Sequence, residues 1–147
     1  MKDQPKILGS FEAVSFPELG VKQVIAKIDT GAYSGALHAT NVREVTVDGK
    51  KSLEFLPLGK PEHKTVTTRY RLKQVKSSNG RLESRYVIRT KITVQAKTYP
   101  ISISLSDRSA MMKSVLLGRR FLRRRGFVVD VRRGTEHRYS VKEGGIQ

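Results

Sequence analysis

Most of the chain alternates apolar and polar residues, with many β-branched side chains, and short turn signals separate the alternating stretches. Alternation with a period of two is typical of strands that bury one face. We expect strands over eight ranges: 7–15, 21–28, 42–47, 52–58, 65–75, 81–95, 98–105 and 127–131. The pattern therefore predicts an all-β protein.

Turn residues predict which strands fold back on each other as hairpins. Asp48-Gly49 follows the third range, and Asn79-Gly80 ends a polar turn between the fifth and sixth. Asparagine, aspartate and glycine tolerate the positive φ angles of tight hairpin turns. Pro17 and Gly20 separate the first two ranges and predict a further hairpin there.

One short helix is expected at about 118–125, because Leu117, Phe121 and Leu122 share a face while arginines cover the other. Gly126 follows, in the position where glycine commonly ends a helix. The chain has no internal repeat, linker or low-complexity tract, so we expect a single domain over residues 1–147.

Composition narrows the chemistry. The chain has no cysteine, which excludes disulfide scaffolds, cysteine nucleophiles and thiolate zinc sites. No apolar run approaches the roughly 18 residues that a membrane span needs, and the start lacks the apolar segment of a secretory signal. We therefore expect a cytoplasmic protein that does not enter the membrane.

The charge is strongly positive, with 29 Lys and Arg against 13 Asp and Glu and a net charge of +16. Such a field attracts polyanions, whether nucleic acid, a membrane surface or an acidic peptide. The alternative is that the excess charge only keeps the protein from associating.

A carboxylate stands at the end of a strongly apolar strand. The run Val24–Ile28 leads directly into Asp29-Thr30-Gly31-Ala32. Gly31 permits a close approach of the backbone, and Thr30 can hydrogen-bond within the turn, so Asp29 would be held rigidly. Taken alone, such a run is also typical of an ordinary surface turn.

A second apolar segment, Val115–Gly118, is followed by Arg119 and the expected helix. With the Asp-Thr-Gly-Ala run and the hairpin at Asn79-Gly80, in this order, it resembles the retropepsin-like aspartic proteases. In that family the hydrophobic-hydrophobic-Gly-Arg segment overlies the Asp-Thr-Gly-Ala strand, and a flap hairpin lies between them in sequence. The resemblance implies a closed β-barrel with one short helix and a flap-like hairpin.

A closer resemblance covers most of the chain and is to a bacterial and archaeal branch labelled ATP-dependent zinc proteases. Members of this branch are often associated with ATP-grasp peptide ligases. The matching stretches are residues 28–39, residues 75–80 with Glu83 and Arg85, and residues 105–122.

The resemblance implies functional roles for nine residues. Catalysis would fall to Asp29, with Thr30 and Gly31 positioning it. Substrate binding is expected from six residues: Ala32, Ser78, Asn79, Gly80, Arg119 and Arg120.

Aspartic proteolysis needs two carboxylates that share a proton, one to activate water and one to protonate the scissile carbonyl. A chain with one motif therefore implies a homodimer with Asp29 on its two-fold axis. In a monomer, Asp107 or Asp130 would have to be the second acid.

Two features depart from the retroviral pattern. Tyr33 stands where retroviral relatives carry an acidic residue that pairs with the arginine of the second motif, so Arg119 needs another partner. The chain also continues for 28 residues after Arg119, so the terminal strands that hold the retroviral dimer need not be arranged in the same way.

The zinc label finds no support in the residues. His38, His63 and His137 lie far apart, and the usual ligand spacings are missing. We expect no metal site and no cofactor, and we interpret His38 as an ordinary hydrogen-bonded histidine on the strand after the Asp29 turn.

Seven arginines fall within 15 residues: Arg119, Arg120, Arg123, Arg124, Arg125, Arg132 and Arg133. They are either a solvated helix face or a surface that recognises a carboxylate-rich substrate. Nucleic acid is possible but less favoured, because the chain has five Phe, five Tyr and no Trp for base stacking and carries no nucleic-acid-binding motif.

The favoured hypothesis is a homodimeric, metal-independent aspartic peptidase that acts on acidic peptides. The association of the resembling branch with glutamate-adding ligases makes a ligated glutamate tail a natural substrate. The alternative hypothesis is a non-catalytic binding module with the same fold, which uses its basic surface for a ribosome, RNA or an acidic partner.

Overall fold

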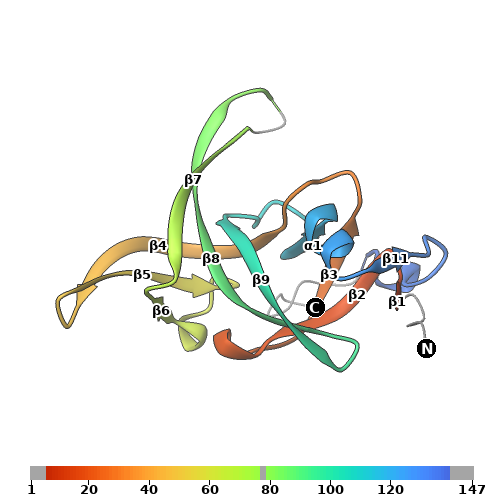
Figure 1. Cartoon of the computed structure of the whole chain (residues 1–147), viewed down its shortest axis with the longest axis horizontal. Helices are drawn as coiled ribbons and strands as arrows, with labels where there is room; N and C mark the ends of the chain where they lie inside the picture. The colour runs from red at the N-terminus through yellow and green to blue at the C-terminus, as the bar shows by residue number, and fades with distance from the viewer. Residues whose placement is uncertain (1–5, 77–78, 140–147) are drawn as a thin grey trace.

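The structure, a computed structural model, describes residues 6–76 and 79–139 of the 147 (Figure 1). Its strands are β1 (Lys6–Leu8), β2 (Phe11–Phe16), β3 (Val21–Asp29), β4 (Ala36–Val47), β5 (Lys50–Pro57), β6 (Thr65–Thr67), β7 (Tyr70–Lys76), β8 (Leu82–Val94), β9 (Lys97–Ser106), β10 (Val115–Gly118) and β11 (Phe127–Val129). The α-helix is α1 (Arg119–Arg124), and 3-10 turns cover Pro17–Leu19, Pro61–His63 and Thr135–His137.

Six strands form a ring because β10 pairs on both of its edges. It runs parallel to β3 on one side and antiparallel to β4 on the other. The remaining pairings run from β3 through β2, β8 and β9 to β4, and β5, β6 and β7 extend the sheet outside this ring. The prediction of an all-β fold with one short helix is confirmed, and the expected closed barrel corresponds to this ring-like sheet.

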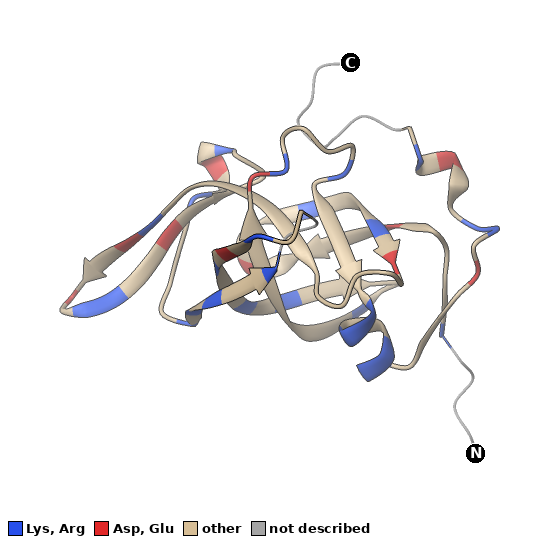
Figure 2. Cartoon of the chain, turned by 90° about the horizontal axis from the view of Figure 1, so that it is seen from above, with Lys and Arg blue, Asp and Glu red and all other residues tan. Residues whose placement is uncertain are grey.

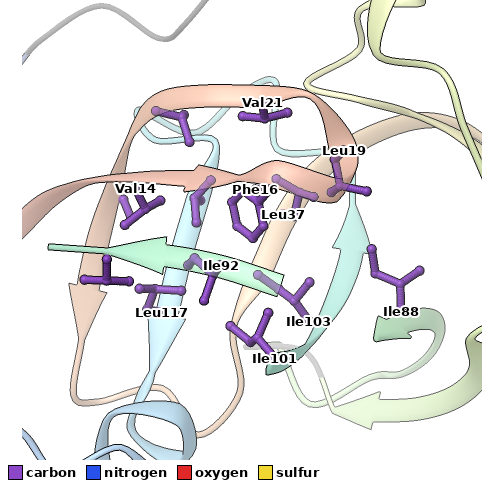
Figure 3. Packing of buried hydrophobic residues seen from close by; sticks show 14 of the residues in the cluster. Val14, Phe16, Leu19, Val21, Leu37, Ile88, Ile92, Ile101, Ile103 and Leu117 are labelled. Carbon is purple, nitrogen blue, oxygen red and sulfur yellow. The ribbon is translucent and has the colours of Figure 1, made fainter. Parts of the chain in front are cut away.

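The core lies inside the ring and draws side chains from nearly every strand of it (Figure 3). Phe16, Leu37, Ile92, Ile103 and Leu117 come from five different strands, and each is at most 1% exposed. Burying a side chain of this size stabilises the fold by roughly 1.5–3 kcal/mol. These contacts fix β10 between β3 and β4, at the place where Asp29 emerges.

Two of the predicted hairpin turns have the backbone that their residues suggested. Asp48 and Gly49 have φ angles of 50° and 76° and join β4 to β5 as a two-residue turn. At the other, Gly80 has a φ of 82°, and the Asn79 side chain accepts a hydrogen bond from the Arg81 amide at 3.2 Å. The β7–β8 hairpin that ends there projects away from the body of the molecule (Figure 1).

Two predicted strands are each divided in the structure. Residues 65–75 give β6, which pairs with β5, and β7, which pairs with β8. Residues 7–15 break at Gly9, where an added Cβ would lie 2.6 Å from the carbonyl oxygen of Arg133. Alternation of apolar and polar residues predicts strand conformation but not the partner, and here each half of a predicted strand pairs with a different neighbour.

The two ends of the described chain pair with each other, since β1 and β11 form a separate two-stranded parallel sheet. The last predicted strand, 127–131, ends at Val129 in the structure, where the Asp130 amide still donates to the Leu8 carbonyl at 2.8 Å and the Asp130 carboxylate binds Arg132 and Arg133 in the turn that follows. The terminal strands are therefore arranged within one chain.

The predicted helix at 118–125 is confirmed as α1, and Gly126 follows it with a φ of 73°. In the described ranges, no helix has the length and apolar content needed to cross a membrane.

Candidate active site

Asp29 is the last residue of β3, and its carboxylate is half-buried at the start of a tight turn. The Gly31 amide donates a hydrogen bond to its Oδ1 at 3.0 Å, and the Ala32 amide donates to its backbone carbonyl at 3.2 Å. Gly31 thus positions the acid through its backbone. Thr30 is exposed and contributes its carbonyl group, which accepts a long contact of 3.5 Å from Arg119.

The loop after Asp29 wraps closely around β10, and two glycines make this possible. In the parallel register, Gly118 lies opposite Asp29. An added Cβ on Gly118 would lie 2.7 Å from the backbone of Ser34 and of Tyr33, and one on Gly35 would lie 2.6 Å from the Leu116 carbonyl oxygen. The glycine of the second motif is therefore required by contact with the loop of the first.

Arg119 contacts backbone carbonyls and an aromatic ring in place of a carboxylate. Its guanidinium donates to the Gly31 carbonyl at 3.2 Å and lies 5.5 Å from the centre of the Tyr33 ring. Its backbone amide donates to the Ala32 carbonyl at 2.8 Å. Tyr33, which departs from the retroviral pattern, thus gives Arg119 an aromatic face in place of an acid. The sequence placed Arg119 in substrate binding, whereas in the single chain it holds the Asp29 loop.

The two candidate second acids of the same chain are engaged elsewhere. Asp107 accepts hydrogen bonds from the amide and hydroxyl of Ser109 and lies 3.8 Å from His38. Asp130 is bound by Arg132 and Arg133. Across residues 6–76 and 79–139, the one hydrogen bond that reaches the Asp29 carboxylate comes from Gly31. Asp29 therefore has no partner acid within the described chain.

Arg108 is a site residue whose role the sequence reasoning missed. It is half-buried, and its Nε donates to the Lys113 carbonyl at 3.1 Å. Burial lowers the pKa of its guanidinium, the nearby charge of Arg85 lowers it further, and the Asp29 carboxylate opposes both. A positive charge thus lies within electrostatic reach of Asp29. The resemblance over 105–122 contained this residue, but nothing in the local pattern connected it to Asp29.

His38 is buried on β4, and its Nδ1 accepts a hydrogen bond from the Arg108 amide at 2.8 Å. This confirms the interpretation of His38 as a hydrogen-bonded histidine. Within the part of the chain that the structure describes, no three His, Asp or Glu side chains gather as they would around a metal ion.

A groove of about 490 Å³ lies between the β7–β8 hairpin and α1. Ser34 and Gly35 of the Asp29 loop and Gly118 of β10 line this groove, whereas Asp29 itself does not. Arg120, an expected substrate-binding residue, does line it, and Figure 2 shows the concentration of basic residues on α1.

Two more of the expected substrate-binding residues lie at the tip of the hairpin, and Ala32 lies in the turn after Asp29. Asn79 and Gly80 are exposed at the hairpin tip. Ser78 falls outside the described residues.

Comparison with known proteins agrees with this geometry. Residues 7–138 match the RimB-like family, described as the retropepsin-like aspartic endopeptidase RimB. A probable alpha-L-glutamate ligase of Desulfotalea psychrophila is 39% identical over 120 residues, which are 78% of this chain and 26% of the relative. A protein of the same name from Shewanella halifaxensis is 34% identical over 128 residues, covering 81% of this chain and 27% of the relative. The chain thus spans about a quarter of the length of these curated relatives.

A crystal structure of a Legionella pneumophila protein of unknown function has a similar fold, with a TM-score of 0.70 and 26% identity. The similarity covers 88% of this chain and 95% of that one. The family match extends over nearly the whole described chain and includes Asp29, Gly118 and Arg119. This chain belongs to the RimB-like family of retropepsin-like aspartic endopeptidases.

Proposed function

We propose that this chain is an aspartic-type peptidase that works as a homodimer and cleaves acidic peptides or ligated glutamate tails. The observation that carries the proposal is the half-buried Asp29 carboxylate, held by the Gly31 amide in a loop that Gly118 and Arg119 fix in place. This is one half of a carboxyl pair on a rigid support. The other half would come from Asp29 of a second chain.

In the proposed reaction, one Asp29 carboxylate takes a proton from water while the water oxygen attacks the peptide carbonyl carbon. The protonated Asp29 of the second chain donates its proton to the carbonyl oxygen. The first Asp29 then donates its proton to the amide nitrogen, the second Asp29 accepts a proton from one hydroxyl of the diol, and the carbon–nitrogen bond breaks to release the amine. Water has then been added across the amide bond, and the pair again shares one proton.

The dimer would be held by surfaces other than the terminal strands, because β1 and β11 pair within one chain. The turn after Asp29 offers exposed residues for this contact, including Thr30 and Tyr33, and the Tyr33 side chain is 50% exposed. Contact across these turns would bring two Asp29 carboxylates together at a two-fold axis.

An acidic substrate is supported by the net charge of +16 and by the relatives. Their names describe them as glutamate ligases, and this chain resembles about a quarter of each. A peptidase that removes glutamate residues would act on the product of such a ligase.

Substitution of Asp29 by Asn tests the proposal, because Asn has nearly the same shape and cannot carry the proton. Wild type and Asp29→Asn would be incubated with oligoglutamate-tagged and basic peptides, each with and without a chelator. We expect cleavage of the acidic peptides to fall by about 10²–10⁴-fold in the variant and to resist chelation. Cleavage that survives in Asp29→Asn would refute the assignment, and loss on chelation would point to a metal.

A non-catalytic binding module is the second candidate function. This alternative is favoured because the described chain gives Asp29 no second acid. A basic groove also lies beside Asp29, where it is available for binding. Sedimentation as a monomer, salt-sensitive RNA binding and no peptidase activity would support this alternative. A dimer that fails to bind RNA would count against it.

A further inference from the structure

We propose that the groove between the β7–β8 hairpin and α1 is a carboxylate-binding subsite, which holds acidic residues of the substrate away from the bond that is cut. The inference rests on the proposed peptidase function and adds the location of the residues that would select the substrate. The groove has a volume of about 490 Å³, which is sufficient for several side chains of a peptide.

The basic residues of the groove follow the geometry of the two elements that form its walls. On the hairpin side, Arg69, Arg71 and Lys73 recur at every second residue, as one face of a strand requires. On the helix side, Arg120 and Arg124 are four residues apart and lie on one face of α1. Two rows of cations thus face a common space.

The groove contains no opposite charge to neutralise these rows. Arg89 and Arg125 complete the basic lining, and no aspartate or glutamate among residues 6–76 and 79–139 lines the groove. Within the described ranges, none of the lining cations forms an ion pair. Like charges that face each other without a counter-ion repel, and an anionic occupant relieves that repulsion.

Arg125, one of the lining residues, has an unsatisfied donor. Its Nη2 donates to the Pro100 carbonyl at 3.3 Å, while its buried Nε has no hydrogen-bond partner among the residues that the structure describes. A buried donor without a partner is unfavourable, and buried polar groups in native proteins are generally satisfied. A carboxylate oxygen is a suitable acceptor for a guanidinium.

The position of the groove makes it a neighbour of the catalytic turn and not part of it. Gly118 lines the groove and lies opposite Asp29 in the β3–β10 register, whereas Asp29, Thr30 and Gly31 do not line it. A peptide bound at Asp29 would therefore reach the groove with residues on one side of the scissile bond. In an extended chain the side chains on one face recur at every second residue, roughly 6.6 Å apart, so alternate carboxylates of the peptide would meet successive basic positions.

A peptide suits this groove better than RNA does. Single-stranded RNA needs open aromatic faces on which bases can stack. The two aromatic residues of the lining are already engaged, since Tyr70 bonds to Glu44 and packs against Tyr86 while Phe121 packs against Tyr99. The guanidinium groups instead suit bidentate pairing with carboxylates.

Binding measurements in the full-length Asp29→Asn protein test the subsite without cleavage of the probe. The probe is a fluorescent oligoglutamate peptide, followed by anisotropy. In this background, Arg71→Gln with Arg124→Gln removes one exposed cation from each wall of the groove. The matched control is Lys22→Gln with Lys50→Gln, which removes the same charge from exposed positions outside the groove.

We expect the groove pair to weaken binding by about tenfold or more and the control pair by less than about twofold. Equal weakening by both pairs, or none by the groove pair, would overturn the subsite. An RNA oligonucleotide of the same length that displaces the peptide and loses affinity in the groove pair alone would reassign the groove to RNA. Unchanged thermal unfolding of both pairs would show that the comparison is between folded proteins.

The two proposals can fail separately. If binding depends on the groove while wild type cleaves nothing, the carboxylate site stands and the peptidase assignment falls. If wild type cleaves and the groove pair cleaves acidic peptides with an unchanged KM, the peptidase stands and the subsite falls. A raised KM for acidic peptides, with KM for neutral peptides unchanged, is the result that the subsite predicts.

Discussion

The loop after β3 and the groove beside it share Ser34 and Gly35, yet they are built in opposite ways. The loop is held by backbone contacts so close that two positions accept only glycine, and it presents a single acid. The groove is open, and its cations form no ion pair with the residues that the structure describes. Rigidity around Asp29 suits chemistry that depends on position, whereas unpaired charge suits recognition of an anion.

The largest loss of stability is expected from Gly118→Ala, which disturbs the loop and leaves the cations of the groove in place. The backbone of Gly118 has φ of −91° and ψ of 173°, which any residue adopts, so the cost would come from the new Cβ against Ser34 and Tyr33. Overpacking of this kind destabilises a protein by roughly 1–3 kcal/mol, and more where backbone must shift. Urea unfolding measures the change, and peptidase activity should fall with the displaced loop.

Gly49→Ala serves as the control for this prediction. An added Cβ on Gly49 would meet no atom within 4 Å, so Gly49→Ala is expected to lose stability, by about 1–2 kcal/mol, through its positive φ of 76° alone. The comparison is therefore made on activity: Gly49→Ala should keep its peptidase activity while folded. An equal loss of activity in both folded variants would mean that contact between Gly118 and the loop is not what fixes the site.

The next largest effect is expected from the adjacent residues Arg119 and Arg120, because Arg119 contacts the Asp29 loop and Arg120 lines the groove. Arg119→Gln removes the guanidinium from the Gly31 carbonyl and the Tyr33 ring, and we expect it to lower the free energy of unfolding by about 1–2 kcal/mol. Arg120→Gln removes a groove cation and should leave stability within about 0.5 kcal/mol of wild type.

The order of the two variants should reverse when affinity for the oligoglutamate probe is measured. Arg120→Gln should lose more affinity than Arg119→Gln. Single exposed charge pairs contribute up to about 1 kcal/mol, so a change of roughly two- to fivefold in Kd is expected. Equal stability losses in the two variants would contradict the separate roles assigned to these neighbours.

The smallest expected effect is on stability and concerns Asp130, a carboxylate held in ion pairs with Arg132 and Arg133. Hydrogen bonding from the Arg132 side chain and amide lowers the pKa of Asp130 from its ordinary value to about 2. A depressed pKa in the folded state means that ionised Asp130 stabilises the protein above about pH 4, and that this contribution is lost as the pH falls through about 2.

Asp130→Asn should therefore be less stable than wild type near neutral pH, and the difference should shrink between pH 4 and pH 2. Unfolding by urea at several pH values measures this difference. A difference that stays constant across the window would mean that ionisation of Asp130 does not contribute. Asp29, which accepts one hydrogen bond from Gly31 among the described residues, provides the contrasting case of a carboxylate for which we propose a chemical role.

Local patterns were sufficient for the elements of the fold. The turn at Asp48-Gly49, the hairpin at Asn79-Gly80 and the helix ended by Gly126 depend on the conformations that these residues permit, and each is found as predicted. Where a predicted strand changes partner, as at Gly9 and between Thr67 and Tyr70, alternation carried no signal. The partner of a strand depends on which distant segment lies beside it in the folded protein, and the local sequence pattern does not identify that segment.

The candidate site divides in the same way. The sequence by itself determined that Asp29 follows a buried strand and, through the resemblance, that Gly118 and Arg119 belong beside it. Only the tertiary structure decided that Arg119 binds loop carbonyls and the Tyr33 ring, that Arg108 reaches Asp29 electrostatically, and that the Arg71 and Arg124 rows face one groove. The reason is physical: conformational preference acts over a few neighbouring residues, whereas contacts and fields depend on segments that meet only after the chain has folded.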